Sequence, residues 1–252
     1  MSIRSQVLTV AATALAAASF GAHALATFTG ADLDGSADIR ASSTISDAAR
    51  SAFAASLSNA VTEGFESAAV GGFTTLALNL PGIGTTTLDG GSGARIASLP
   101  AGTTDGFGRY PNSGSRYLLV ESGRLTVSFS SRVAAFGFYG IDIGDFDTSM
   151  RMTLNFADGG SQLIDLGLPQ GIDGTRTFYG VIAGNSGEEL NSVLLEGDAT
   201  FIDVFAVDDM IVSPGAQVCR TGCDLPEPGM PALLGLGLLA LATGRGRQRH
   251  GT

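Results

Sequence analysis

Apolar and polar residues alternate with a period of two along much of the chain between residues 65 and 213. Leu125, Val127 and Phe129, for example, are separated by polar residues, which is typical of a strand with one buried face. The segments with strand-like apolar patterns are 76–80, 94–99, 116–121, 125–129, 133–143, 152–156, 161–166, 177–182, 192–196 and 200–212. No helical pattern separates them, so the sequence predicts an antiparallel β-sandwich of the jelly-roll type.

Turn residues divide these segments. Asp158-Gly159-Gly160 predicts a hairpin turn between the strands at 152–156 and 161–166. The glycine-rich segment 89–93 has no following lysine or helix, so it is not a phosphate-binding loop, and we expect a plain loop there.

One helical pattern precedes the strands. Four apolar residues recur at a spacing that places them on one face of a helix: Ala49, Phe53, Leu57 and Val61. Thr44 and Asp47 have the spacing of a capping box. We therefore expect a polar stretch over 27–43 and an amphipathic helix over 45–61 that packs on the domain. A helix that binds a partner is the alternative.

The N-terminal segment has the three parts of a secretory signal peptide. Arg4 supplies the positive start, residues 7–20 form a short apolar run, and Ala24 and Ala26 offer small residues for cleavage. We expect removal of about residues 1–26 by signal peptidase after transfer through the Sec machinery. A buried N-terminal helix is the alternative.

The C-terminal segment joins a short motif, an apolar stretch and a basic cluster. Pro226, Glu227 and Pro228 come first, and no charged residue follows until Arg245. That stretch has the minimum length of a transmembrane helix. The basic cluster, which is Arg245, Arg247 and Arg249, is expected to stay cytoplasmic, with the domain outside the inner membrane. A simple membrane anchor is the alternative.

This order of parts closely resembles the PEP-CTERM sorting signal of Gram-negative bacteria. The resemblance implies an exosortase as partner, a transient membrane anchor, and delivery to the cell surface or to an exopolysaccharide matrix. It covers about the last 25 residues, and Met230-Pro231 departs from the small and apolar residues usual there. The expected parts of the chain are thus 1–26, 27–64, the sandwich at 65–213, a linker at 214–225, and the tail at 226–252.

Two short motifs resemble the edges of lectin-like jelly rolls. They are the segments 63–66 and 205–212. The resemblance implies that Glu66, Asp208 and Asp209 hold a structural calcium ion, whose hard chemistry suits carboxylate oxygens. The alternative is that Asp208 and Asp209 are ordinary acidic residues at a turn or at the edge of the sheet.

The two cysteines lie in the linker. Cys219 and Cys223 are close together in a chain that we expect to be exported, so the sequence predicts a disulfide between them.

Charge excludes one class of partner. The formal net charge is −10, and all 14 basic residues are arginine. Four arginines lie in the end segments, so the domain between them is more acidic still. An acidic surface repels phosphate, and we expect no nucleic-acid partner.

Histidine content excludes several kinds of catalysis. His23 and His250 both lie in the expected targeting segments, so the mature domain lacks histidine for a catalytic triad or a usual zinc site. Carboxylate pairs for a glycosidase remain in principle: Glu63, Glu66, Glu121, Glu188, Glu189 and Glu196. The cluster Asp142, Asp145 and Asp147 permits a cation loop, and a solvated turn is the favoured interpretation.

The sequence thus favours an exported surface or matrix protein with a non-catalytic structural or adhesive sandwich. A carbohydrate-binding module is the first alternative, with exopolysaccharide as its partner. A glycoside hydrolase is the second.

Overall fold

The computed structural model describes residues 25–144, 150–166, 172–197 and 202–214 of the 252-residue chain. These residues contain one helix, α1 (Thr44–Ala55). The strands are β1 (Ala26–Asp32), β2 (Val61–Glu63), β3 (Gly71–Leu80), β4 (Gly84–Ser98), β5 (Arg116–Val120), β6 (Arg124–Ile141), β7 (Met150–Phe156), β8 (Ser161–Asp165), β9 (Arg176–Ile182), β10 (Leu190–Gly197) and β11 (Phe205–Pro214). The predicted mainly β fold is confirmed.

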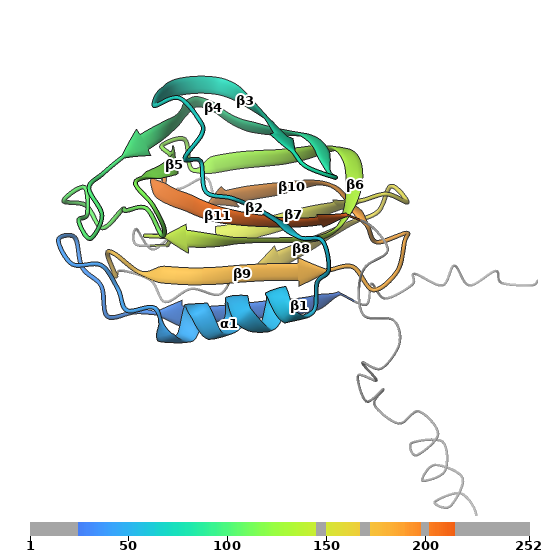
Figure 1. The fold of residues 1–252 in the computed structure, drawn as a ribbon, viewed down its shortest axis with the longest axis horizontal. Coiled ribbons are helices and arrows are strands. Elements are labelled where there is room, and N and C mark those ends of the chain that lie inside the picture. The colour runs from blue at the N-terminus through green and yellow to red at the C-terminus, as the bar shows by residue number, and fades with distance from the viewer. Residues whose placement is uncertain (1–24, 145–149, 167–171, 198–201, 215–252) are drawn as a thin grey trace, which may run out of the picture.

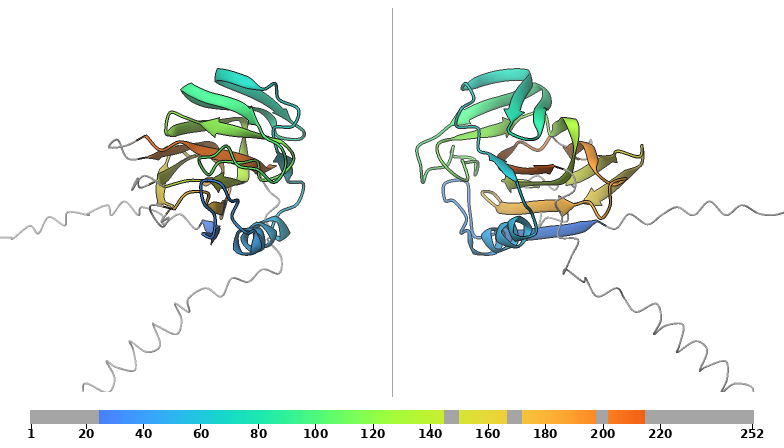
Figure 2. Two further views of the ribbon diagram at one scale, coloured as in Figure 1. Left: turned by 90° about the vertical axis from the view of Figure 1, so that its left-hand side faces the viewer. Right: turned by 45° about the vertical axis from the view of Figure 1, so that its right-hand side comes forward.

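Strand β6 belongs to both layers of the sandwich. Its first part pairs with β4 and β10, and its second part, 133–141, pairs with β9 and β11. One layer therefore runs β3-β4-β6-β10-β7-β8, the other runs β1-β9-β6-β11-β2, and β5 joins β4 to β11. Figures 1 and 2 show β3 and β4 at one end of the stack and β1 with α1 at the other. Every strand pairing among the described residues is antiparallel, so the antiparallel sandwich-like architecture is confirmed.

Two hydrophobic clusters stabilise this arrangement. The larger cluster joins apolar side chains of the two layers, such as Val127, Leu154 and Phe136. The smaller cluster lies on the other face of the second layer and includes Phe53 of α1 with Tyr139 of β6. The second part of β6, β9 and most of β11 are thus buried on both faces. Burial on both faces explains why these segments are continuously apolar in sequence instead of alternating.

A pair of glycines receives the helix. Gly137 of β6 and Gly180 of β9 face each other in the strand register. A Cβ atom on either would come within 2.9 Å or less of the Phe53 ring. That ring also packs against Phe28 and Phe178, each with its centroid 5.5 Å away. Two residues without side chains therefore form the space into which α1 inserts its aromatic anchor.

The helix begins differently from the predicted capping box. The side chain of the N-cap residue, Ser43, makes no capping hydrogen bond. Asp32, at the end of β1, accepts hydrogen bonds from the N–H groups of Ile45 and Ser46, both at 2.9 Å. A distant carboxylate thus satisfies the free amides of the first turn. Burial acts to raise the pKa of Asp32, but these bonds and one from the Ser46 hydroxyl lower it overall.

The helix also ends earlier than the predicted range 45–61. It stops at Ala55, and Val61 lies in β2, where it pairs with Val212 of β11. Sheet pairing outweighs the helical spacing of Leu57 and Val61. The predicted polar stretch 27–43 likewise contributes a strand, since β1 pairs with β9 along its whole length.

The glycine-rich segment 89–93 is a second correction. It lies inside β4 and not in a loop. Gly90 leaves room for Ala94, because a Cβ atom on Gly90 would come 2.3 Å from the Ala94 Cβ. Gly91 has φ +62°, and the register with β3 shifts between Phe73 and Thr75. The glycines thus permit an irregularity in a continuous strand.

The predicted hairpin at Asp158 is confirmed, with Gly159 at φ +90° between β7 and β8. Several other predictions lie outside the described residues. They are most of the signal peptide, the Cys219–Cys223 disulfide, and the sorting motif with its apolar stretch and arginines. Within the described ranges, no helix is long and apolar enough to cross a membrane.

Candidate binding site at one end of the sandwich

Two long connections lie side by side at one end of the molecule. The first loop, 33–43, joins β1 to α1, and the second loop, 99–115, joins β4 to β5. They are the blue and green loops at the left of Figure 1. The carbonyl oxygen of Ala37 accepts hydrogen bonds from Gly108 N at 2.9 Å and from Thr104 Oγ1 at 2.7 Å. The two loops are therefore joined directly to each other.

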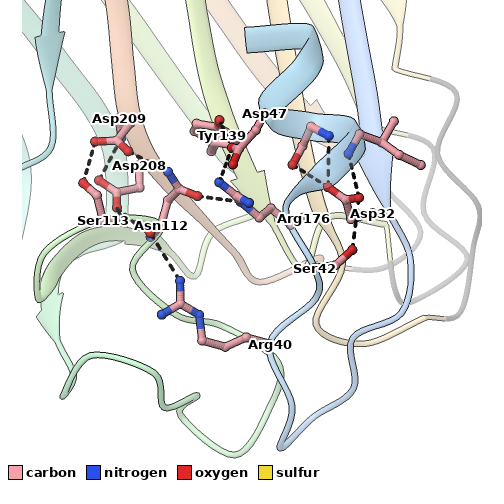
Figure 3. A network of polar contacts seen from close by, with 12 residues as sticks. Asp32, Arg40, Ser42, Asp47, Asn112, Ser113, Tyr139, Arg176, Asp208 and Asp209 are labelled. Atoms are coloured by element: carbon pink, nitrogen blue, oxygen red, sulfur yellow. Dashed lines mark hydrogen bonds and ion pairs between the residues drawn. The ribbon is translucent and has the colours of Figure 1, made fainter. Parts of the chain in front are cut away.

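The aspartate pair of β11 holds the second loop on the sheet (Figure 3). Asp208 Oδ2 accepts hydrogen bonds from the backbone N–H groups of Asn112, at 2.7 Å, and Ser113, at 3.1 Å. Asp209 accepts hydrogen bonds from Asn112 Nδ2 at 2.6 Å and from Ser113 Oγ at 2.8 Å. Burial, followed by repulsion from Asp209, raises the pKa of Asp208 to about 8. These two carboxylates hold a loop nearly one hundred residues away in sequence.

Glu66 anchors the far end of the same loop. Its Oε1 accepts hydrogen bonds from the N–H groups of Ser115 and Arg116, both at 2.7 Å. These bonds lower the pKa of Glu66. The turn requires glycine at 114, where φ is +59° and a Cβ atom would come 2.3 Å from Glu66 Oε1. The backbone of this turn is shaped around the carboxylate.

The two lectin-like motifs do meet in space. A Cβ atom on Gly64 would stand 3.0 Å from Asp209 Oδ1 and 3.8 Å from Asp208 Oδ1. Glu66, Asp208 and Asp209 all bind the segment 112–116. In the described part of the chain, no three acidic, cysteine or histidine side chains are grouped so as to hold a metal ion. Calcium binding by these three residues stays a prediction.

Asn112 is the centre of the polar network. Its backbone N–H and side-chain amide donate to the aspartate pair, and its carbonyl oxygen accepts a hydrogen bond from Arg40 Nη2 at 3.2 Å. Its Oδ1 accepts a hydrogen bond from Arg176 Nε at 2.6 Å. Both donors and both acceptors of one residue are thus used.

Arg176 extends the network to the helix. Its Nη2 donates to Asp47 Oδ1 at 2.6 Å, and its guanidinium lies 4.5 Å from the centroid of the Tyr139 ring. The Tyr139 hydroxyl donates to the same Asp47 oxygen. Burial opposes ionisation of Asp47, but the Tyr139 bond and the Arg176 charge lower its pKa overall. Asp47 is therefore a carboxylate at neutral pH.

A polar hollow of about 340 Å³ opens beside this network. Its lining combines α1, the second loop and the sheet: Asp47, Arg50, Ser51, Asn112, Tyr139, Arg176 and Asp209. The sequence did not indicate Asn112 or Arg176, because they are far apart and form no motif. The one available signal was Arg176, a charged residue at the head of an apolar strand.

Three of the carboxylates considered for a glycosidase have partners within the protein. Glu121 pairs with Arg95, and Glu189 pairs with Arg132, at 3.3 and 3.4 Å. Glu63 accepts a hydrogen bond from Phe65 N at 2.7 Å. The acids that do share the hollow, Asp47 and Asp209, were not among the carboxylates considered for a glycosidase.

Asp142 corrects another expectation. The favoured interpretation of its cluster was a solvated turn, but Asp142 is only 1% exposed. Burial is the main cause that raises its pKa to about 7. Asp145 and Asp147 lie outside the described residues.

No protein-family model matches the sequence, and no curated protein matches it. Solved structures give weak likenesses. The K1 cleaved adhesin domain of Lys-gingipain from Porphyromonas gingivalis W83 is 10% identical, with a TM-score of 0.36 over 63% of this chain and 100% of that one. The family 22 carbohydrate-binding module of Clostridium thermocellum Xyn10B is 14% identical, with a TM-score of 0.34 over 63% and 95%. The CBM22-1 xylan-binding domain from Paenibacillus barcinonensis Xyn10C is 12% identical, with a TM-score of 0.34 over 62% and 95%. Likenesses at this level assign no function to the chain.

Proposed function

We propose that the protein is an exported surface or matrix protein whose jelly-roll-like sandwich is a non-catalytic adhesive module. Its contact surface is the end formed by loops 33–43 and 99–115. The observation that carries this proposal is the polar network that fixes both loops to the sheet through Asn112. Loops held by a rigid scaffold are where proteins most often place recognition. A loop that is ordered before binding also loses less conformational entropy on binding.

The second loop presents an exposed aromatic residue. Phe107 is 67% exposed, and Ile39 of the first loop is 64% exposed. Asp105 Oδ1 accepts hydrogen bonds from Phe107 N at 2.9 Å and from Arg109 N at 3.1 Å, and Arg109 Nε donates to Asp105 Oδ2 at 2.9 Å. These bonds fix the backbone of the turn that exposes Phe107. Aromatic side chains often serve as anchors in interfaces.

The chemistry of the hollow favours binding over catalysis. A glycosidase needs one carboxyl group that keeps its proton near neutral pH and a second carboxylate facing it. Asp47 has a lowered pKa and binds Tyr139 and Arg176, while Asp209 binds Asn112 and Ser113. Asp208, whose pKa is raised, is fully buried and does not line the hollow. Asp47 thus joins the helix to the sheet, and Asp209 joins the sheet to the second loop.

Export and sorting complete the proposal. The signal peptide and the tail with Pro226, Glu227 and Pro228 support passage across the inner membrane, processing by an exosortase, and transfer to the cell surface or matrix. Deletion of residues 226–252 is expected to change how much of the protein is retained at the cell surface and how much is released. Unchanged distribution between cells, surface and medium would contradict the sorting proposal.

The adhesive role is tested in the native host. We expect Phe107→Ala to lower the share of protein retained in the washed matrix, because it removes the anchor without touching the core. Leu163→Ala is the matched control, since Leu163 is 58% exposed on β8. Equal retention of the wild-type protein and the Phe107→Ala variant would refute this contact surface.

Carbohydrate binding is the second candidate, favoured by the polar hollow. Carboxylate, amide and guanidinium groups of Asp47, Asn112 and Arg50 line it, and such groups pair well with sugar hydroxyls. Binding on a glycan array that is lost with Arg50→Ala would support it. Failure to bind any matrix polysaccharide would count against it.

A further inference from the structure

In the described part of the chain, the buried carboxylate of Asp142 has a hydrogen-bond partner on only one of its two oxygens. Asp142 directly follows β6, and its φ is +62°. Residues other than glycine rarely adopt this left-handed backbone conformation. The Oδ1 of Asp142 accepts a hydrogen bond from Gly174 N at 2.7 Å. Its Oδ2 is buried and has no hydrogen-bond partner. A buried carboxylate oxygen without a partner destabilises the folded state, and the positive φ adds backbone strain at the same residue.

Among the described residues around it, none donates a hydrogen bond to Oδ2 of Asp142. The space beside Oδ1 is closed, because a Cβ atom on Gly108 would come 2.6 Å from that oxygen. The backbone N–H of Asp142 donates to the Thr175 carbonyl at 2.9 Å. Arg109 is the nearby cation, and its Nε donates to Asp105. A partner for Oδ2 must therefore come from outside these groups.

Two further acids, Asp203 and Asp173, lie beside the backbone segments that contain Asp142 and Gly174. Asp203 Oδ2 accepts a hydrogen bond from Gly144 N at 2.7 Å, two residues after Asp142. Asp173 directly precedes Gly174, which donates to Asp142. Both acids act to raise the pKa of the Asp142 carboxyl, so their negative charge reaches it. Asp142 and Asp203 are 1% and 0% exposed, which strengthens the repulsion between them.

We propose that Asp142 and Asp203, with Asp173 beside them, bind a calcium ion. Calcium takes hard oxygen ligands in flexible geometry and accepts backbone carbonyls and water together with carboxylates. Because no three acidic side chains of the described residues are grouped tightly enough to enclose a metal, two carboxylates would supply the charge and neutral oxygens the rest. The ion would give Oδ2 of Asp142 its missing partner and offset the repulsion.

This assignment differs from the lectin-like one. Glu66 Oε1 accepts two backbone N–H bonds, and so does Asp208 Oδ2. Those oxygens already have donors from the protein. The Oδ2 of Asp142 has none, and for that reason calcium is placed here and not at Glu66, Asp208 and Asp209.

The test is a calcium titration of the purified full chain after removal of divalent ions with EDTA. Calcium chloride at about one hundred times its Kd is expected to raise the Tm by roughly 5–10 °C, and calorimetry should give one site. Asp142→Asn keeps the shape of the side chain and should abolish both effects. Asp158→Asn, the same change in an exposed turn, should leave both intact.

Two further variants keep the test decisive if Asp142→Asn does not fold. Asp203→Asn should weaken calcium binding at least tenfold, and Glu66→Gln should not change it. The proposal is overturned if the wild-type chain shows no calcium-dependent change in Tm. It is equally overturned if Glu66→Gln removes the effect while Asp203→Asn retains it.

Discussion

Phe53 is predicted to be the main attachment of α1 to the sandwich. The residue is fully buried, and its ring occupies the space left by Gly137 and Gly180. Replacing a buried phenylalanine with alanine in general costs about 3–5 kcal/mol. For a domain of this size each kcal/mol lowers the Tm by roughly 2–4 °C, so Phe53→Ala should lower it by roughly 6–20 °C.

A double-mutant cycle makes the prediction specific. A Cβ atom on Gly180 would stand 2.7 Å from Phe53 Cδ2, so Gly180→Ala in the wild-type chain should cost about 1–3 kcal/mol through overpacking. In the Phe53→Ala background that contact is gone, and the same change should cost much less. The coupling free energy should reach about 1 kcal/mol or more.

Urea denaturation of the four chains measures the cycle, with Gly72→Ala as the matched control. A Cβ atom on Gly72 would meet only Ala94 O, at 3.8 Å, so this change should be nearly neutral. Additive effects of Phe53→Ala and Gly180→Ala, or a loss below about 1 kcal/mol for Phe53→Ala, would refute the packing described for α1.

Three other changes test the site. Asp32→Asn should lower the free energy of unfolding above pH 4, and the difference from wild type should shrink as the pH falls below 4. The reason is that the pKa of Asp32 is lowered in the folded state, so its stabilisation is present above its unfolded pKa of about 3.9 and is lost in acid. Urea titrations at several pH values measure this, and a difference that does not change with pH would contradict it. Gly114→Ala should destabilise the folded protein by about 1–3 kcal/mol, since φ is +59° and the new Cβ meets Glu66. The expected readout is faster hydrogen exchange of the Ser115 and Arg116 amides. Exchange at the wild-type rate would contradict it. Arg176→Lys should lower the free energy of unfolding by about 1–3 kcal/mol, because a single ammonium cannot bridge Asn112 and Asp47 as the guanidinium does. A thermal melt equal to that of the wild type would count against this role.

The strands were largely predictable because their side chains repeat with the pleat. Leu125, Val127 and Phe129 alternate in sequence and are buried on one face of β6. The end of the helix was not predictable. Val61 continues the helical spacing, but its pairing with Val212 is a contact with the other end of the domain. Local pattern gives no information about such pairing.

The site was predictable only in part. The Glu63–Glu66 segment and the Asp208–Asp209 pair do come together, as the lectin-like motifs implied. Their main partner, the segment around Asn112, was missed because its bonds join single side chains to backbone groups across 96 and 95 residues. Asp142 was misjudged for a related reason. A run of glycines and aspartates is typical of a solvated turn, but here Gly108 and Gly174, both distant in sequence, pack against the Asp142 carboxylate.

Binding of the purified full chain to immobilised, washed extracellular matrix from its own host tests the adhesive role most directly. Wild-type protein should bind saturably, Phe107→Ala should bind about tenfold more weakly or worse, and Leu163→Ala should match the wild type. Absence of saturable binding by the wild-type chain, or equal affinity of the wild-type and Phe107→Ala chains, would contradict the proposal that these two loops form an adhesive surface.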